Sequence, residues 1–112
     1  MIKFGKGKYM TDKDWYKSLP KKRMGVGVIL LNENNEILIV KPVYKDHWTL
    51  AGGVVDENES LYLAAQREVK EELDLDINEL ILACVDYISR DGEKDDNLQF
   101  IFLWWPVIQN AN

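Results

Sequence analysis

The chain has 112 residues and a formal net charge of −5, from 14 Lys and Arg against 19 Asp and Glu. This length predicts one domain, and a hydrophobic content of 46% is enough for a small core. The acidic balance argues against a nucleic-acid-binding protein, which would present a basic face. No segment approaches the ~18 consecutive apolar residues of a membrane span, and the start lacks the apolar run of a signal peptide. We therefore expect a cytoplasmic protein without membrane contact.

The first half of the chain predicts an arm followed by a hairpin of two strands. Residues 1–23 are polar and mixed, and Pro20 lies near the end of this arm. Residues 24–31 (MGVGVILL) predict a buried strand, and residues 36–41 (EILIVK) predict the strand that returns along it. The Asn-rich residues 32–35 predict the turn between them, because Asn tolerates positive φ.

The second half predicts a helix between strands. A short strand is expected around residues 48–50, before a pair of glycines. Ser60 is a good N-cap, so the helix should run from Ser60 to about Leu73. Two further strands are expected at residues 80–89 and 97–107, joined by a polar loop at residues 90–96. The helix side that would pack on the sheet carries Tyr62, Ala65, Val69 and Leu73. Cys84, the only cysteine, excludes an internal disulfide, and its apolar run LILACV predicts an inert core residue.

Three glutamates of the predicted helix share one face. Glu68, Glu71 and Glu72 have the spacing i, i+3, i+4, which places their side chains together. Such a run, taken alone, is usually a solvated acidic face, but three like charges also destabilise a helix unless something neutralises them. Carboxylate oxygens favour a hard cation such as Mg²⁺ or Mn²⁺, which keeps positions open for waters and substrate phosphates. The pattern therefore indicates metal-assisted phosphate chemistry.

Residues 53–75 (GVVDENESLYLAAQREVKEELDL) resemble the Nudix box. The box is a glycine, five residues, a Glu, seven residues, and then Arg-Glu-aliphatic-x-Glu-Glu-x-Gly-aliphatic; Gly53, Glu59 and Arg67 begin its three parts here. Asp74 replaces the last glycine, and Asp adopts a left-handed helix end less easily than Gly. Ala51 stands where the family often has Pro.

The resemblance implies a fold of the α+β kind. It is an α/β/α sandwich in which the box helix packs on a mixed β-sheet, and we expect it over residues 24–112. Members of the family usually continue with another strand and a second helix. We therefore expect either a C-terminally truncated form or an oligomer, such as a homodimer, that covers the exposed sheet face. Trp104 and Trp105 should lie on opposite faces of the sheet.

The resemblance also implies a Nudix pyrophosphohydrolase that uses Mg²⁺ or Mn²⁺. Its substrate would be a small molecule in which a nucleoside diphosphate is linked to a group X. The implied metal ligands are the backbone carbonyl of Gly52 and the side chains of Glu68, Glu71 and Glu72, with Glu68 and Glu72 the firmest. The same three glutamates are the implied catalytic residues, although in this family the general base varies between a box glutamate and an acid on a later loop.

Glu59 and Arg67 are expected to support the site without taking part in catalysis. The resemblance implies an ion pair that orients the carboxylates; the plain alternative is a surface pair worth less than ~1 kcal/mol. Gly52 and Gly53 would permit a close backbone approach to metal or phosphate, or simply form the turn that ends a strand.

Weaker candidates for substrate contact lie outside the box. They offer a positive charge, an aromatic face or a further acid, although each residue type is more often structural or solvated. These candidates are Lys41, Lys45, His47, Trp48, Glu93, Asp95 and Asp96, with Tyr44, Trp15 and Tyr16 as further aromatic rings that could stack on a base.

Other functions compete with hydrolysis. A non-catalytic Nudix-like domain that binds a nucleotide and regulates a partner is the main alternative, although the intact REVKEE run argues against it. A prenyl diphosphate isomerase or a base glycosylase on the same fold, or an interaction protein, has less support. The group X, the general base, the number of metal ions and the oligomeric state stay open at this point.

Overall fold

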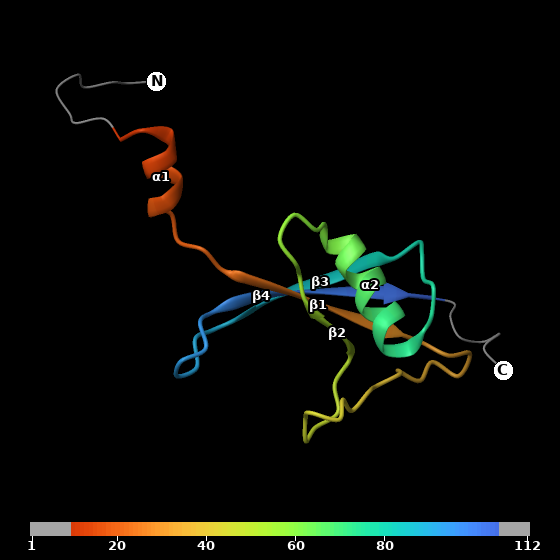
Figure 1. Cartoon of the computed structure of the whole chain (residues 1–112). Coiled ribbons are helices and arrows are strands. Elements are labelled where there is room, and N and C mark those ends of the chain that lie inside the picture. Colours follow the sequence, from red (N-terminus) through yellow and green to blue (C-terminus); the bar gives the residue numbers. More distant parts are fainter. Residues whose placement is uncertain (1–9, 106–112) are drawn as a thin grey trace.

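The structure, a computed structural model, describes residues 10–105. Each of its two helices is followed by two strands, and Figure 1 shows α2 lying against the sheet while α1 projects away from it. The elements are α1 (Asp12–Ser18), β1 (Arg23–Leu30), β2 (Ala51–Val54), α2 (Leu61–Leu73), β3 (Ile81–Ile88) and β4 (Asn97–Trp104). No helix in residues 10–105 is long and apolar enough to cross a membrane.

The four strands form one mixed sheet in the order β2-β1-β4-β3. β1 runs parallel to β4 and antiparallel to β2, and β3 runs antiparallel to β4. The predicted mixed sheet with the box helix packed on it is therefore confirmed. The second helical layer of the predicted sandwich is not found among residues 10–105.

The core lies between α2 and the middle of the sheet. Alternate residues of β1, namely Val26, Val28 and Leu30, point towards the helix and are at most 3% exposed. The small residues Ala64 and Ala65 let α2 approach the sheet closely. The remaining buried apolar residues are Ala51, Val69, Ile77 and Phe102.

The ends of α2 follow from its capping residues. The Ser60 side chain accepts a hydrogen bond from the Leu63 N–H at 3.1 Å, which satisfies a free donor of the first turn. At the other end, Asp74 takes the left-handed conformation, with φ 55° and ψ 35°. The predicted start and end of the helix are correct, and Asp74 adopts the conformation for which the box normally uses glycine.

The predicted returning strand at residues 36–41 is wrong as a strand. The chain does turn back at residues 32–35, where the Asn32 side chain accepts bonds from the Asn34 and Glu36 N–H groups, each at 2.9 Å. Afterwards it forms only isolated bridges, between Leu31 and Ile37 and between Val40 and Thr49. The physical reason is competition, because β4 pairs with one edge of β1 along its whole length and β2 pairs with the other edge at residues 25–28.

The strand predicted at residues 48–50 begins later than expected. β2 covers Ala51 to Val54, so the paired glycines lie inside the strand and do not end it. A side chain at Gly52 would come within 2.0 Å of the Val26 carbonyl oxygen. This close approach, which only glycine allows, places β2 on β1.

The prediction that Cys84 is a core residue is wrong. Cys84 is exposed, as is every other residue of β3. β3 forms one edge of the sheet, and α2 packs on β1 and β2 at the other side, so no described element covers β3. The apolar sequence of β3 is therefore a surface strand.

The polar arm at residues 1–23 contains a helix that we did not predict. The Thr11 side chain accepts a bond from the Asp14 N–H at 3.1 Å and caps the start of α1. Trp15 and Tyr16 lie on this helix with their rings 4.9 Å apart, edge to face. No residue of α1 is buried. At the other end of the chain, residues 106 and 107 of the last predicted strand lie outside the described residues; Trp104 is half-buried and Trp105 is exposed.

Candidate active site

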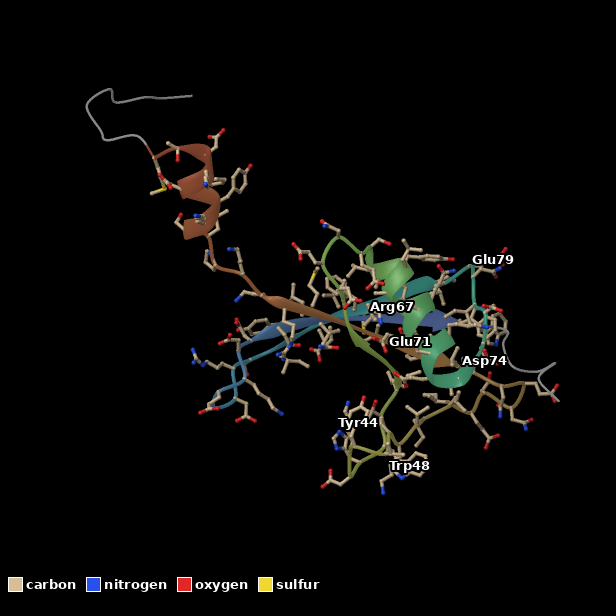
Figure 2. The ribbon with its side chains drawn as sticks, in the orientation of Figure 1. Tyr44, Trp48, Arg67, Glu71, Asp74 and Glu79 are labelled. Carbon is tan, nitrogen blue, oxygen red and sulfur yellow. The ribbon has the colours of Figure 1, made fainter. Side chains whose placement is uncertain are left out.

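Arg67 contacts several acidic groups at the box helix, and Figure 2 labels it near one of them, Glu71. Its guanidinium binds the Glu59 carboxylate through two hydrogen bonds, Nε–Oε2 at 2.7 Å and NH2–Oε1 at 2.9 Å. It also donates to Glu68 at 2.8 Å and to the Val54 carbonyl at 3.0 Å. Because a paired guanidinium has a fixed planar geometry, Arg67 fixes the Glu68 carboxylate relative to β2.

Glu59 is held as an anion by these contacts. The hydrogen bonds from Arg67, together with the Asp56 N–H, lower the pKa of the Glu59 carboxyl to about 2. The same pair raises the pKa of Arg67 above its already high value. Neither group is available to exchange protons near neutral pH, so both suit a supporting role.

Glu68 and Glu72 meet the backbone of the paired glycines. Glu72 accepts a hydrogen bond from the Gly52 N–H at 3.2 Å. A side chain at Gly53 would come within 2.5 Å of the Glu68 carboxylate, so glycine leaves the space that this carboxylate occupies. The helix spacing i, i+4 puts the two acids one turn apart on the same face. They therefore form a pair of carboxylates at the outer edge of β2.

Glu72 differs from an ordinary surface acid. Burial raises the pKa of its carboxyl, and the neighbouring Glu68 carboxylate raises it as well, while the Gly52 N–H and the charge of Lys45 oppose the rise. A cation beside Glu72 would offset this unfavourable effect of burial and of the neighbouring negative charge.

Glu71 lies apart from this pair. Its side chain is 57% exposed, and its recorded contact is with Arg67 at 3.4 Å. Within residues 10–105, no three His, Cys, Asp or Glu side chains are arranged so that they could hold a metal ion together. The structure thus brings Gly52, Glu68 and Glu72 together and leaves Glu71 at the margin.

Two of the predicted lysines lie beside the carboxylates. Lys41 and Glu72 line a cavity of about 250 Å³ together with residues 42–44, including Tyr44. Lys45 lines a second cavity of about 400 Å³ that also reaches Gly52 and Gly53. Both lysines come from the loop before β2, so a phosphate at Glu72 would meet positive charge from this loop.

The other aromatic and histidine candidates are more exposed. Among residues 10–105, the ionic partner of His47 is its neighbour Asp46, at 3.2 Å, and the His47 side chain is 65% exposed. Tyr44 and Trp48 lie on the same loop, below α2 in Figure 2, and both are exposed. Trp15 and Tyr16 lie on α1, away from the box helix (Figure 1).

The acids of the β3–β4 turn are engaged elsewhere. Asp96 pairs with Lys22 and accepts a hydrogen bond from the Tyr87 hydroxyl at 2.8 Å, and these contacts lower the pKa of its carboxyl. Asp95 lies 3.9 Å from Arg90. Figure 1 shows this turn, which also carries Glu93, at the end of the sheet away from α2. The structure does not bring these three acids to the carboxylate pair.

Comparison with known proteins identifies the family of this chain. The family model described as NUDIX domain matches residues 21–110. The chain belongs to the Nudix family. Among solved structures, the MutT Nudix hydrolase from Burkholderia pseudomallei is similar, with a TM-score of 0.65 and 25% identity over 75% of this chain and 67% of that one.

Curated Nudix relatives are similar over part of their length. An RNA pyrophosphohydrolase from Pelagibacter ubique is 36% identical over 75 residues, which cover 65% of this chain and 48% of the relative. An 8-oxo-dGDP phosphatase from Danio rerio is 35% identical over 81 residues, 70% of this chain and 23% of the relative. This Nudix chain thus spans about half or less of the length of these relatives.

Sequence reasoning missed several residues around the Nudix box. Asp56 lies 3.5 Å from Arg67, and its N–H donates to Glu59 at 3.0 Å. Arg23 and Gln99 line the larger cavity, although they are far from the box in sequence. One available signal was the alternation Gly25-Val26-Gly27, which leaves one face of β1 without side chains.

Proposed function

We propose that this chain is a divalent-metal-dependent hydrolase that cleaves the diphosphate bond of a nucleoside diphosphate linked to a group X. Nudix membership and the names of the relatives, which are pyrophosphohydrolases and phosphatases, support the reaction class. The observation that carries the proposal is the carboxylate pair of Glu68 and Glu72 against the paired glycines of β2. Because one relative is named an RNA pyrophosphohydrolase, the candidate substrates include an RNA end that carries a diphosphate group.

The residues present fit a divalent cation. Mg²⁺ is usually bound by one or two carboxylates and completes its coordination with waters and substrate phosphates, so a pair of acids is sufficient. Glycine at position 53 keeps backbone and carboxylate close, and a side chain there would fill the space. We assign the cation to Glu68, Glu72 and the Gly52 carbonyl; Glu71, which lies apart beside Arg67, is not assigned as a ligand of this cation. Mg²⁺ and Mn²⁺ both suit these oxygen ligands.

The protein groups then have separate tasks. A divalent cation, when bound, neutralises phosphoryl oxygens and lowers the pKa of a water. Arg67, held by Glu59, keeps Glu68 in position. Lys41 and Lys45 bind the diphosphate, and a box glutamate accepts the proton of the attacking water. That water attacks one phosphorus, the bond to the bridging oxygen breaks, and each product leaves with one phosphate group.

The direct test is a hydrolysis screen with nucleoside diphosphate derivatives, Mg²⁺ and a phosphatase-coupled phosphate readout. We expect turnover that EDTA abolishes and that Mg²⁺ or Mn²⁺ restores. No turnover across the panel by folded protein would overturn the proposal and favour a nucleotide-binding domain without catalysis.

The same screen tests the individual acids. Glu72→Gln should lower turnover on the order of 100-fold or more, because it removes a cation ligand and a candidate base, while far-UV circular dichroism stays unchanged. Glu71→Gln, at the exposed margin, should cost less. Near-normal activity of Glu72→Gln would contradict the assigned ligands.

A further inference from the structure

The larger cavity, of about 400 Å³, lies on the sheet face turned away from α2. In β1, Val26 and Val28 face the helix, so Gly25 and Gly27 face the opposite side. Their partners in β4 are Gln99 and Ile101, whose side chains share that face. The two glycines therefore form a floor of backbone, and this floor is buried beneath the Gln99, Ile101 and Leu50 side chains. Its volume falls in the range of small-molecule sites, roughly 300–1,000 Å³.

Gln99 lies across this floor in a fixed position. A side chain at Gly25 would come within 2.5 Å of the Gln99 amide, so this amide occupies the space that the glycine leaves. The Gln99 Nε2 donates to the Asn97 Oδ1 at 2.7 Å, and Asn97 is itself only 6% exposed. A buried partner on the same strand thus orients the amide. Its second N–H and its Oε1 have no hydrogen-bond partner among the described residues.

The rest of the lining suits a planar, partly apolar ligand attached to phosphate. Leu50 and Ile101 supply apolar surface beside Gln99, and Arg23 and Lys45 supply positive charge. The cavity also reaches Gly52 and Gly53, whose backbone meets the Glu72 and Glu68 carboxylates. A ligand in the cavity could therefore extend a phosphate towards the carboxylate pair.

We propose that Gln99 reads the base of the nucleotide substrate, so that the cavity over Gly25 and Gly27 is a nucleobase site. A Gln amide with one free donor and one free acceptor pairs with a base edge that presents an amine beside a ring nitrogen, as adenine does. This inference rests on the proposed function for its ligand class, but it makes a claim about binding that does not need hydrolysis.

Binding of monophosphates tests the site separately from catalysis. AMP has no diphosphate bond, so its affinity does not depend on turnover. NMR titration in EDTA would compare AMP, purine riboside 5′-monophosphate, which lacks the amine, and ribose 5-phosphate, which lacks the base. We expect AMP to bind about 3- to 10-fold more tightly than the riboside, the range of one or two hydrogen bonds, and ribose 5-phosphate to bind most weakly.

Two variants assign the effect to Gln99. Gln99→Met keeps the length of the side chain but removes the amide, and it should bring the AMP-to-riboside ratio close to one. Gly25→Ala should do the same indirectly, because the new methyl group would displace the amide. Asp86→Asn is the control, since Asp86 pairs with Gln99 in the sheet but does not line the cavity; its ratio should match that of the unmodified chain.

The outcomes separate this proposal from the hydrolase. Equal affinity for AMP and ribose 5-phosphate in the unmodified chain would overturn the base site, whether or not any variant folds. An unchanged ratio in folded Gln99→Met would overturn the role of Gln99. Base-dependent binding without any hydrolysis would support the nucleobase site and contradict the proposed hydrolase. Hydrolysis without base-dependent binding would support the hydrolase and contradict the nucleobase site.

Discussion

Arg67 connects β2, the loop before α2 and the acidic helix face at once. Lysine keeps the charge but cannot make paired hydrogen bonds to Glu59 and still reach Glu68 and the Val54 carbonyl. We expect Arg67→Lys to lower the free energy of unfolding in urea by about 1–2 kcal/mol, after allowing for partial exposure. Activity should fall as well, because Glu68 loses its orientation.

The control for this change is Arg90→Lys. Arg90 is exposed and lies 3.9 Å from Asp95, so the same substitution there should alter stability by less than about 0.5 kcal/mol. If both variants lose equal stability, the contacts of Arg67 are not what holds the box together.

The lowered pKa of Glu59 predicts how stability responds to acid. Its folded value is about 2, against an ordinary value of 4.5, so the ion pair contributes stability above pH 4.5. That contribution is lost as the pH falls towards 2, because the unfolded chain takes up the proton first. Urea unfolding at about pH 5 and about pH 3 should show the loss, and Glu59→Gln should lose less over that interval.

Glu72 works in the opposite direction. Since burial raises its pKa, protonation at low pH relieves a cost of the folded state. If the free energy of unfolding rises steadily as the pH is lowered from about 5 to about 3, the contribution of Glu72 is larger than that of Glu59. That result would contradict the prediction.

At this scale, the sequence predicts the partners that lie on one helix and its cap. The resemblance to the Nudix box is enough to expect the ion pair of Glu59 and Arg67, because both residues belong to one continuous motif. The contacts of Gly52, Lys45 and Gln99 depend on how separate strands and a loop meet, which helix periodicity does not encode. Glu71 shows the limit of a prediction from helix spacing. Its spacing is that of a metal ligand, but its exposed side chain lies 3.4 Å from Arg67.

At the scale of elements, α2 could be placed from its caps and its period. The strand expected at residues 36–41 could not be rejected in the same way. A strand needs a free partner, but β4 occupies one edge of β1 along its whole length and β2 occupies the other edge at residues 25–28. Helix signals are local, whereas strand pairing is decided by competition between distant segments.

Asp74 gives a prediction about the end of α2. The left-handed conformation costs a non-glycine residue about 1–2 kcal/mol, and Asp74 adopts it with φ 55°. Its pairing with Lys70, at 3.0 Å, involves a largely exposed carboxylate and should contribute little. We therefore expect Asp74→Gly to raise the free energy of unfolding by about 0.5–1 kcal/mol.

Asp74→Ala is the matched comparison. Both substitutions remove the carboxylate next to Lys70, so their difference isolates the backbone conformation. Alanine should be less stable than glycine by about 1 kcal/mol in thermal or urea unfolding. Equal stability of the two variants would mean that the left-handed end is not maintained in solution.

At the scale of the whole molecule, burial is uneven across the sheet. α2 covers β1 and β2, while β3 at the opposite edge exposes all eight of its residues. An apolar strand sequence alone does not reveal which edge of a sheet it will occupy, and for this reason Cys84 was expected in the core. The polar arm adds to this uneven burial, since no residue of α1 is buried.

This asymmetry predicts that the arm is dispensable for folding. Residues 1–18 include α1, which lies away from the sheet in Figure 1, whereas Lys22 pairs with Asp96 and β1 starts at Arg23. A chain that begins at residue 19 should therefore keep its free energy of unfolding within about 0.5 kcal/mol, as for changes away from packed contacts. Extending the deletion through Lys22 should cost more, because it removes the contact with Asp96. If the shorter deletion already lowers stability by more than about 1 kcal/mol, α1 must pack on the domain in solution.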